Sequence, residues 1–133
     1  MSTIKSLLIF VFFILGISLG CFAQTAYEWY QKGKATDSYE DKVQYYTNAL
    51  KLNPNYARAY YHRGLTLNKL EEYNAAIEDF SKVVELDSAH TFTFISRGDS
   101  YKHLGQKEDA IIDYTKAINL DTQNPWGYRT VSV

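Results

Sequence analysis

Three histidines are the residues of this chain best suited to acid–base chemistry or metal binding, because an imidazole changes charge near neutral pH. They are His62, His90 and His103. Their spacing matches no metal-ligand pattern, and the sequence contains neither a glycine-rich phosphate loop nor a nucleophile-elbow motif. We therefore expect no catalytic residue, no metal and no cofactor, and we interpret each histidine as a surface residue on a helix or in a turn.

Two pairs of arginine and aspartate could instead hold a charged ligand or each other. Arg63 precedes Asp79 by the same interval as Arg97 precedes Asp113. A catalytic carboxylate seldom arises once per structural unit, so the recurrence favours a structural role. An ion pair within each unit is the first interpretation, and a pair of ligand-binding arginines is the second.

An internal repeat determines the elements that position these residues. Residues 57–90 and 91–124 align with each other without a gap. Repeats of about 34 residues are typical of solenoids, whose units stack because none can bury its apolar face alone. The two segments are identical at Arg63/Arg97, Gly64/Gly98, Leu70/Leu104, Ala76/Ala110, Ile77/Ile111, Asp79/Asp113, Lys82/Lys116, Leu86/Leu120 and Asp87/Asp121.

The order of large, small and aromatic residues in each segment resembles the tetratricopeptide repeat (TPR) family, which builds two antiparallel helices per repeat. Glycine costs about 1 kcal/mol relative to alanine inside a helix, so a close helix crossing is expected at each repeated glycine. The motifs are Tyr60-x-x-Arg63-Gly64-x-x-Leu67 with Ala76-x-x-x-Phe80, and Phe94-x-x-Arg97-Gly98-x-x-Tyr101 with Ala110-x-x-x-Tyr114.

A degenerate copy of the pattern precedes these two. Trp29-x-x-Lys32-Gly33 matches the first-helix motif, but Lys42 stands where the alanine is expected. Tyr39 follows Gly33 three residues sooner than in the second copy, which predicts a turn shortened by three residues. The resemblance thus implies an all-α solenoid of about three helix-turn-helix repeats, over residues 26–56, 57–90 and 91–124, followed by a short segment, 125–133, that holds a helix fragment.

The N-terminus has the form of a bacterial secretory signal. Lys5 precedes an apolar run over residues 7–19, and Cys21 and Ala23 are small residues at the positions that a signal peptidase reads. We expect residues 1–23 to be a signal peptide cleaved after Ala23, with a TPR domain over residues 24–133 in the periplasm or secreted. Two alternatives attach the protein to a membrane: lipidation of Cys21, although Ser18 stands where leucine is expected, and an uncleaved anchor.

Composition excludes some classes of partner. The formal net charge is −1, and loss of Lys5 with the signal would make it −2. No basic stripe is left to neutralise phosphates, so we expect no binding to nucleic acid. The only cysteine, Cys21, would leave with the signal, so no disulfide is expected.

The resemblance places function on the concave face, which the first helix of each repeat lines in this family. Relatives that bind the terminal carboxylate of a peptide carry lysine and asparagine where this chain has Tyr61 and Leu65, so that type of adaptor is disfavoured. We predict an exported interaction module that binds a peptide or partner protein. The alternatives are a sugar-binding or enzymatic protein, a fragment of a larger TPR protein, and a face covered by neighbouring helices or a second subunit. The predicted binding residues are Arg58, Tyr61, Leu65, Lys69, Phe92, Ile95, Asp99 and Lys102.

Stacked repeats usually end in a capping helix with a polar face, and we expect none after Leu120. Pro125-Trp126-Gly127-Tyr128 follows the third repeat and places Tyr128 one repeat length after Phe94. We expect Trp126 and Tyr128 to cover the last apolar face only in part. A partly covered face favours self-association through this end, or a partner that docks on it end-on.

Overall fold

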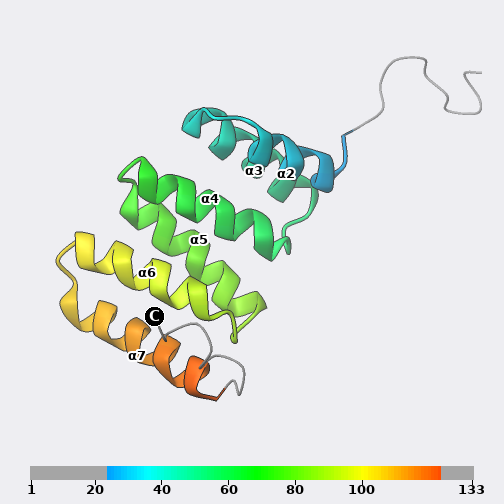
Figure 1. Ribbon diagram of the computed structural model, residues 1–133. Coiled ribbons are helices and arrows are strands. Elements are labelled where there is room, and N and C mark those ends of the chain that lie inside the picture. Colours follow the sequence, from blue (N-terminus) through cyan, green and yellow to red (C-terminus); the bar gives the residue numbers. More distant parts are fainter. Residues whose placement is uncertain (1–23, 124–133) are drawn as a thin grey trace, which may run out of the picture.

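The computed structural model describes residues 24–123, which form six helices and no strands (Figure 1). Successive helices pair as three hairpins, and the hairpins stack in chain order. The predicted all-α solenoid is thereby confirmed, whereas the predicted signal peptide and the segment 125–133 lie outside the described residues. The helices are α2 (Ala26–Ala35), α3 (Tyr39–Leu52), α4 (Ala57–Lys69), α5 (Tyr73–Leu86), α6 (Thr91–His103) and α7 (Lys107–Thr122).

Polar side chains fix the start of the first hairpin. The Thr25 hydroxyl accepts a hydrogen bond from the Glu28 amide at 3.2 Å, and the Glu28 carboxylate accepts one from the Thr25 amide at 2.8 Å. This reciprocal pair is a capping box. Ser38 caps α3 in the simpler way, by accepting from the Asp41 amide at 3.2 Å. The repeat with the weakest sequence resemblance therefore has the best-capped helices.

Each hairpin is closed by a glycine that faces an aromatic ring. A Cβ atom on Gly64 would lie 2.7 Å from the Phe80 ring, and one on Gly98 would lie 2.8 Å from the Tyr114 ring. These distances are shorter than carbon atoms tolerate, so only glycine admits the ring. The predicted close crossing is confirmed, and Gly33 repeats it in the first hairpin.

The first repeat is shortened in its first helix, so the predicted shortening of its turn is wrong. Three residues connect the helices in every hairpin, residues 36–38, 70–72 and 104–106, whereas α2 has 10 residues and α4 has 13. The missing residues come from the end of α2. Three residues are nearly one helical turn, so α2 ends about one turn earlier than α4 does. The residues that remain in α2 keep the same packed face.

Lys42 compensates for this shortening. It occupies the place of Ala76, and its ammonium group donates hydrogen bonds to the carbonyl of Gly33, at 3.3 Å, and to the carbonyl of Thr36. Carbonyls at the end of a helix have no partner within it, and a cation there also complements the helix dipole. The lysine thus caps α2 where the other repeats pack a methyl group.

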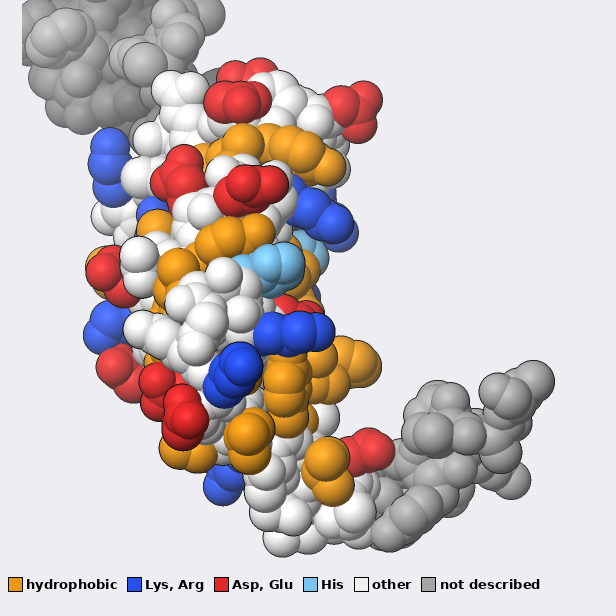
Figure 2. Space-filling model, turned by 90° about the vertical axis from the view of Figure 1, so that its left-hand side faces the viewer, with side chains coloured by type: hydrophobic (Ala, Val, Ile, Leu, Met, Phe, Trp, Pro, Cys, Tyr) orange, Lys and Arg blue, Asp and Glu red, His pale blue; other side chains and the backbone are white. Residues whose placement is uncertain are grey.

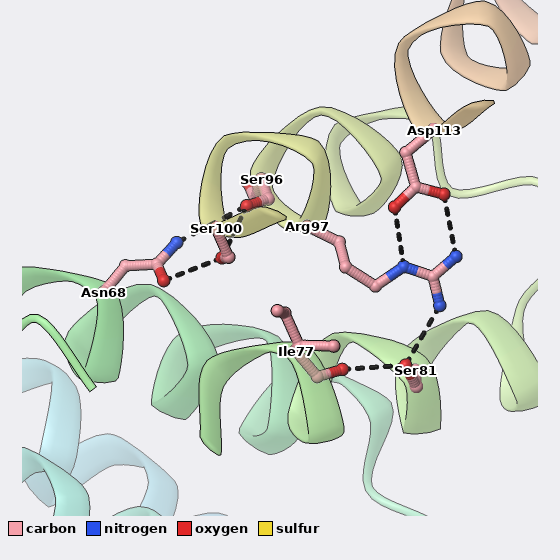
Figure 3. Close-up of polar contacts among 7 residues, drawn as sticks. All are labelled: Asn68, Ile77, Ser81, Ser96, Arg97, Ser100 and Asp113. Atoms are coloured by element: carbon pink, nitrogen blue, oxygen red, sulfur yellow. Dashed lines mark hydrogen bonds and ion pairs between the residues drawn. The ribbon is translucent and has the colours of Figure 1, made fainter. Parts of the chain in front are cut away.

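The arginine and aspartate pairs are ion pairs that join three helices (Figure 3). Arg97 on α6 donates to Asp113 on α7 at 2.7 and 2.8 Å, and its third nitrogen donates to the Ser81 hydroxyl on α5 at 3.0 Å. Arg63 does the same with Asp79 and with the Thr47 hydroxyl on α3. These contacts confirm the structural interpretation, because all three guanidinium nitrogens of each arginine donate hydrogen bonds within the fold.

A second polar contact joins the second and third repeats on the other side of α6. The Asn68 side chain donates to the Ser96 carbonyl at 3.4 Å and accepts from the Ser100 hydroxyl at 2.8 Å (Figure 3). Ser100 is fully buried. The shortened α2 has no counterpart of Asn68, so this contact is specific to the last junction.

Candidate partner-binding face

The first helices of the repeats line the inner side of a curved molecule. Figure 2 shows the repeats following an arc that is hollow on one side. Within residues 24–123, α4 contacts α6 directly, and no comparable contact joins α5 to α7. Helices on the inside of a curve lie closer together than those outside it. The concave face is therefore formed by α2, α4 and α6.

On α4, the predicted site residues divide into exposed cations and half-buried apolar residues. Arg58 and Lys69 are exposed. Tyr61 and Leu65 are half-buried and pack against the core cluster that contains Phe80. The structure thus places the two apolar residues at the edge of the core, where one side of each remains open.

On α6, all four predicted residues are exposed. Phe92 is 67% exposed and Ile95 is 39% exposed. Asp99 and Lys102 are also exposed, and Asp99 accepts a hydrogen bond from the Tyr114 hydroxyl at 2.6 Å. Burial and this hydrogen bond together raise the pKa of Tyr114 to about 12. Asp99 is therefore held in place, whereas Phe92 is open to a ligand.

A hollow of about 560 Å³, here called the central hollow, lies across the first two junctions. Three rings follow one another along the edge of this hollow. The ring centre of Tyr61 lies 4.9 Å from that of His90, and the ring centre of His90 lies 6.3 Å from that of Phe92. Arg58 is the cation of this hollow. The residues that line it are Tyr30, Ala57, Arg58, Tyr61, His62, Val83, Asp87 and His90.

The prediction that His62 is a surface residue on a helix holds only in part, because the residue lies on α4 and lines the central hollow but is partly covered by its neighbours. His62 is half-buried, with its ring 5.6 Å from that of Tyr30 and 6.0 Å from that of Tyr46. Burial lowers the pKa of His62, and the charges of Lys34, Lys42 and Arg58 lower it further. The central hollow is therefore lined by aromatic rings together with the cation Arg58 and the carboxylate of Asp87.

Two further hollows lie on either side of α6. One, of about 330 Å³, brings together Leu65, Lys69 and Asp99 with Asn68, Tyr73, Ser96 and His103. The other, here called the end hollow, has about 460 Å³. The end hollow is lined by Thr91, Phe92, Ile95, Tyr114, Ala117, Ile118 and Asp121.

Residues 24–123 contain no group of three or more His, Cys, Asp or Glu side chains arranged to hold a metal ion. Over the same stretch, no helix is both long enough and apolar enough to cross a membrane. The hollows of the concave face combine aromatic rings and aliphatic side chains with cations such as Arg58 and Lys69 and with the carboxylates of Asp87 and Asp99.

Comparison with known proteins identifies the repeats. Two family models described as tetratricopeptide repeat match residues 57–90 and 93–124. No curated protein of similar sequence was found.

Several solved structures share the fold. The crystal structure of MamA is 26% identical with a TM-score of 0.73, over 74% of this chain and 60% of the MamA chain. The chain therefore spans about 60% of the length of that relative. The TPR2B domain of yeast Sti1, solved as a pHsp70 complex, is 26% identical with a TM-score of 0.69, over 74% and 81% of the two chains. The second TPR of Spaghetti (RPAP3), bound to the HSP90 peptide SRMEEVD, has a TM-score of 0.70 at 23% identity, over 73% and 93%, and shows the shared fold alone.

The match of both segments, the paired helices and the shared fold lead to one conclusion: residues 57–90 and 93–124 are tetratricopeptide repeats, and together with the hairpin of α2 and α3 they form an all-α solenoid.

Proposed function

We propose that the protein is an interaction module that binds a segment of a partner protein along its concave face. The observation that carries this proposal is the central hollow with its rim of rings from Tyr61 through His90 to the exposed Phe92. Aromatic residues that stay partly open in a concave site are typical anchors of protein interfaces. The Sti1 domain of the same fold was solved as a pHsp70 complex, which supports a peptide as the ligand.

The charges of the face favour a partner segment with acidic character. Arg58, Lys69 and Lys102 are all exposed along α4 and α6. Burial is the largest cause of the lowered pKa of His62, and the nearby charges of Lys34, Lys42 and Arg58 lower that pKa further. A partner segment with an acidic side chain next to a hydrophobic anchor would match both the cation Arg58 and the aromatic rings of the hollow.

An internal segment fits this face better than a free C-terminus. The resemblance to the family implies lysine and asparagine where a terminal carboxylate is bound, and this chain has Tyr61, Leu65, Ile95 and Asp99 at the corresponding places. Aromatic and aliphatic side chains bind side chains of the partner rather than a carboxylate. We propose an extended or helical segment with hydrophobic anchors, and no catalytic activity.

Export is part of the proposal. The apolar run over residues 7–19 and the small residues at Cys21 and Ala23 support cleavage after Ala23 and a periplasmic or secreted protein. Attachment to a membrane through an uncleaved or lipidated N-terminus is the alternative.

A displayed peptide library, panned on the purified protein, tests the proposed binding face. The best peptide should lose affinity by about thirtyfold with Phe92→Ala, which corresponds to about 2 kcal/mol for an aromatic anchor. Ile112→Ala is the matched control, because Ile112 is 64% exposed on α7 and lines none of the three hollows described above. Tyr61→Ala is less suitable, since the Tyr61 ring lies 6.1 Å from that of Phe80 and its loss would also disturb the core. Equal affinity for the wild type and Phe92→Ala would refute the proposed face.

A further inference from the structure

The residues that line the end hollow occupy the same repeat positions as a core cluster of the first repeat. In the first repeat, residues of the next helix, α4, pack against that cluster. The cluster of Tyr30, Tyr46, Ala49 and Leu50 contains Ala59, and Tyr60 packs against it. In the repeat register, the positions of Tyr30, Tyr46, Ala49 and Leu50 correspond to those of Ile95, Tyr114, Ala117 and Ile118 in the third repeat. All four line the end hollow. The end hollow therefore has the walls of a core and lacks its filling within residues 24–123.

Burial along the repeats shows how much of this wall is open. Tyr46 is 2% exposed and Phe80 is 0% exposed, whereas the equivalent Tyr114 is only half-buried. Leu50 is 7% exposed, and the equivalent Ile118 is 61% exposed. The exposed fractions differ because α4 covers the first copy of the cluster and α6 covers the second, whereas no helix follows α7 within residues 24–123.

The residues that fill the first two copies follow a simple pattern, a small residue and then an aromatic one. Ala59 and Tyr60 occupy these places on α4, and Thr93 and Phe94 occupy them on α6. Ala59 and Thr93 are fully buried, and Phe94 is 4% exposed. The next copy of the pattern, one repeat length further along the chain, is Gly127-Tyr128.

We propose that the segment of residues 125–133 docks on α7 of its own chain and places Tyr128 in the end hollow. Pro125 supports a helical start, because it falls on the position of Thr91, the first residue of α6, and proline favours the first turn of a helix. The walls of the hollow are apolar, and a tyrosine ring matches the Tyr60 and Phe94 rings in kind and size. This inference goes beyond the proposed partner-binding face, because it concerns the end of the solenoid.

The repeat register also predicts which aromatic residue of the segment remains exposed to solvent. Trp126 falls on the position of Phe92, which is 67% exposed near the start of α6. Trp126 is therefore the matched control for Tyr128. Burial of Tyr128 alone separates docking in register from a nonspecific collapse of two aromatic residues onto the apolar end.

Thermal unfolding of the full chain with its natural N-terminus tests the docking. Tyr128→Ala should lower the midpoint by about 4–8 °C or more, which is the shift that a loss of about 1 kcal/mol in stability produces in a domain of this size. Tyr128→Phe should retain the wild-type midpoint, as Phe94 does in its place, and Trp126→Ala should change it by less than half as much as Tyr128→Ala. Equal shifts for Tyr128→Ala and Trp126→Ala would overturn the proposal.

Sedimentation velocity distinguishes the chain's own segment from a second copy. If the segment covers α7, the wild type should remain a monomer and Tyr128→Ala should associate more strongly, because it uncovers Ile118. A wild type that dimerises, with a midpoint that rises with concentration and Tyr128→Ala unchanged, would show that a second copy fills the end hollow. That result would refute the docking of residues 125–133 while leaving the proposed partner-binding face untouched.

Discussion

Arg97 on α6 and Asp113 on α7 form a two-pronged ion pair, with nitrogen to oxygen distances of 2.7 and 2.8 Å. The Asp113 side chain is buried, and the third nitrogen of Arg97 binds Ser81 in the preceding repeat. One pair therefore stabilises both a hairpin and the junction between two hairpins.

This geometry predicts strong coupling between the two charges. In a double-mutant cycle, Arg97→Ala and Asp113→Ala should couple by about 1–3 kcal/mol in urea unfolding, because either single change leaves a charge without its partner. The exposed pair Lys82 and Glu85, at 2.6 Å, is the matched control and should show much weaker coupling. Additive effects at Arg97 and Asp113 would contradict the structural role.

Adding a methyl group at a crossing glycine should destabilise the fold. Gly64→Ala would normally stabilise a helix by about 1 kcal/mol. Here the new Cβ would lie 2.7 Å from Phe80, so we expect a net loss of about 1–3 kcal/mol in the free energy of unfolding. The exposed Glu78→Ala should stay within about 0.5 kcal/mol. A more stable Gly64→Ala would show that the ring can move aside.

Lys42→Ala restores the residue that the other repeats carry, yet it should destabilise this chain. The change removes hydrogen bonds to the carbonyls of Gly33 and Thr36 and should cost about 1–2 kcal/mol in chemical unfolding. Lys116→Ala, an exposed lysine on α7, is the control and should be nearly neutral. A neutral Lys42→Ala would mean that water caps α2 equally well.

His62 should make stability depend on pH. Burial and nearby cations lower the pKa of His62 in the folded protein, so the unfolded chain binds a proton first as the pH falls. The stability that neutral His62 contributes is thus present above the ordinary value near 6.5 and decreases as the pH falls below it toward the folded pKa. Urea unfolding from pH 7.5 down to 5 should show a steeper loss for the wild type than for His62→Phe. Parallel curves would place the ring in a water-like environment.

The N-terminus can be checked by intact mass. Because the apolar run is short and ends at small residues, the exported protein should begin at Gln24. A retained N-terminus or a lipid adduct on Cys21 would replace the proposed periplasmic or secreted form with a membrane-attached one.

The features that the sequence predicted are those whose two partners both recur at a fixed interval. Gly64 with Phe80 and Arg63 with Asp79 have the same spacing along the chain, and each pair occurs in two copies, so periodicity alone identifies them. Thr47 and Ser81, which complete the arginine contacts, also recur, but a small hydroxyl residue on a helix has no distinctive pattern until its donor is located.

Other features depend on three-dimensional detail that periodicity does not contain. A deletion of three residues in the first repeat fits either a shorter turn or a shorter helix, because nearly one helical turn can be lost without rotating the packed face. The burial of His62 depends on Tyr30 and Tyr46 from a different repeat. Whether Tyr61 belongs to the core or to the groove is a matter of degree, since its ring touches both Phe80 and His90. The predicted binding residues as a set stay a prediction.

The polar junctions also set the order in which the solenoid opens. Helix α5 is bound on one side through Asp79 to Arg63 and on the other through Ser81 to Arg97. Neither end hairpin can separate from the middle without exposing a guanidinium group that has lost its hydroxyl partner. Such shared contacts couple neighbouring repeats, and we expect the middle hairpin of α4 and α5, which is bound to both neighbours, to be the last to lose its protection from solvent.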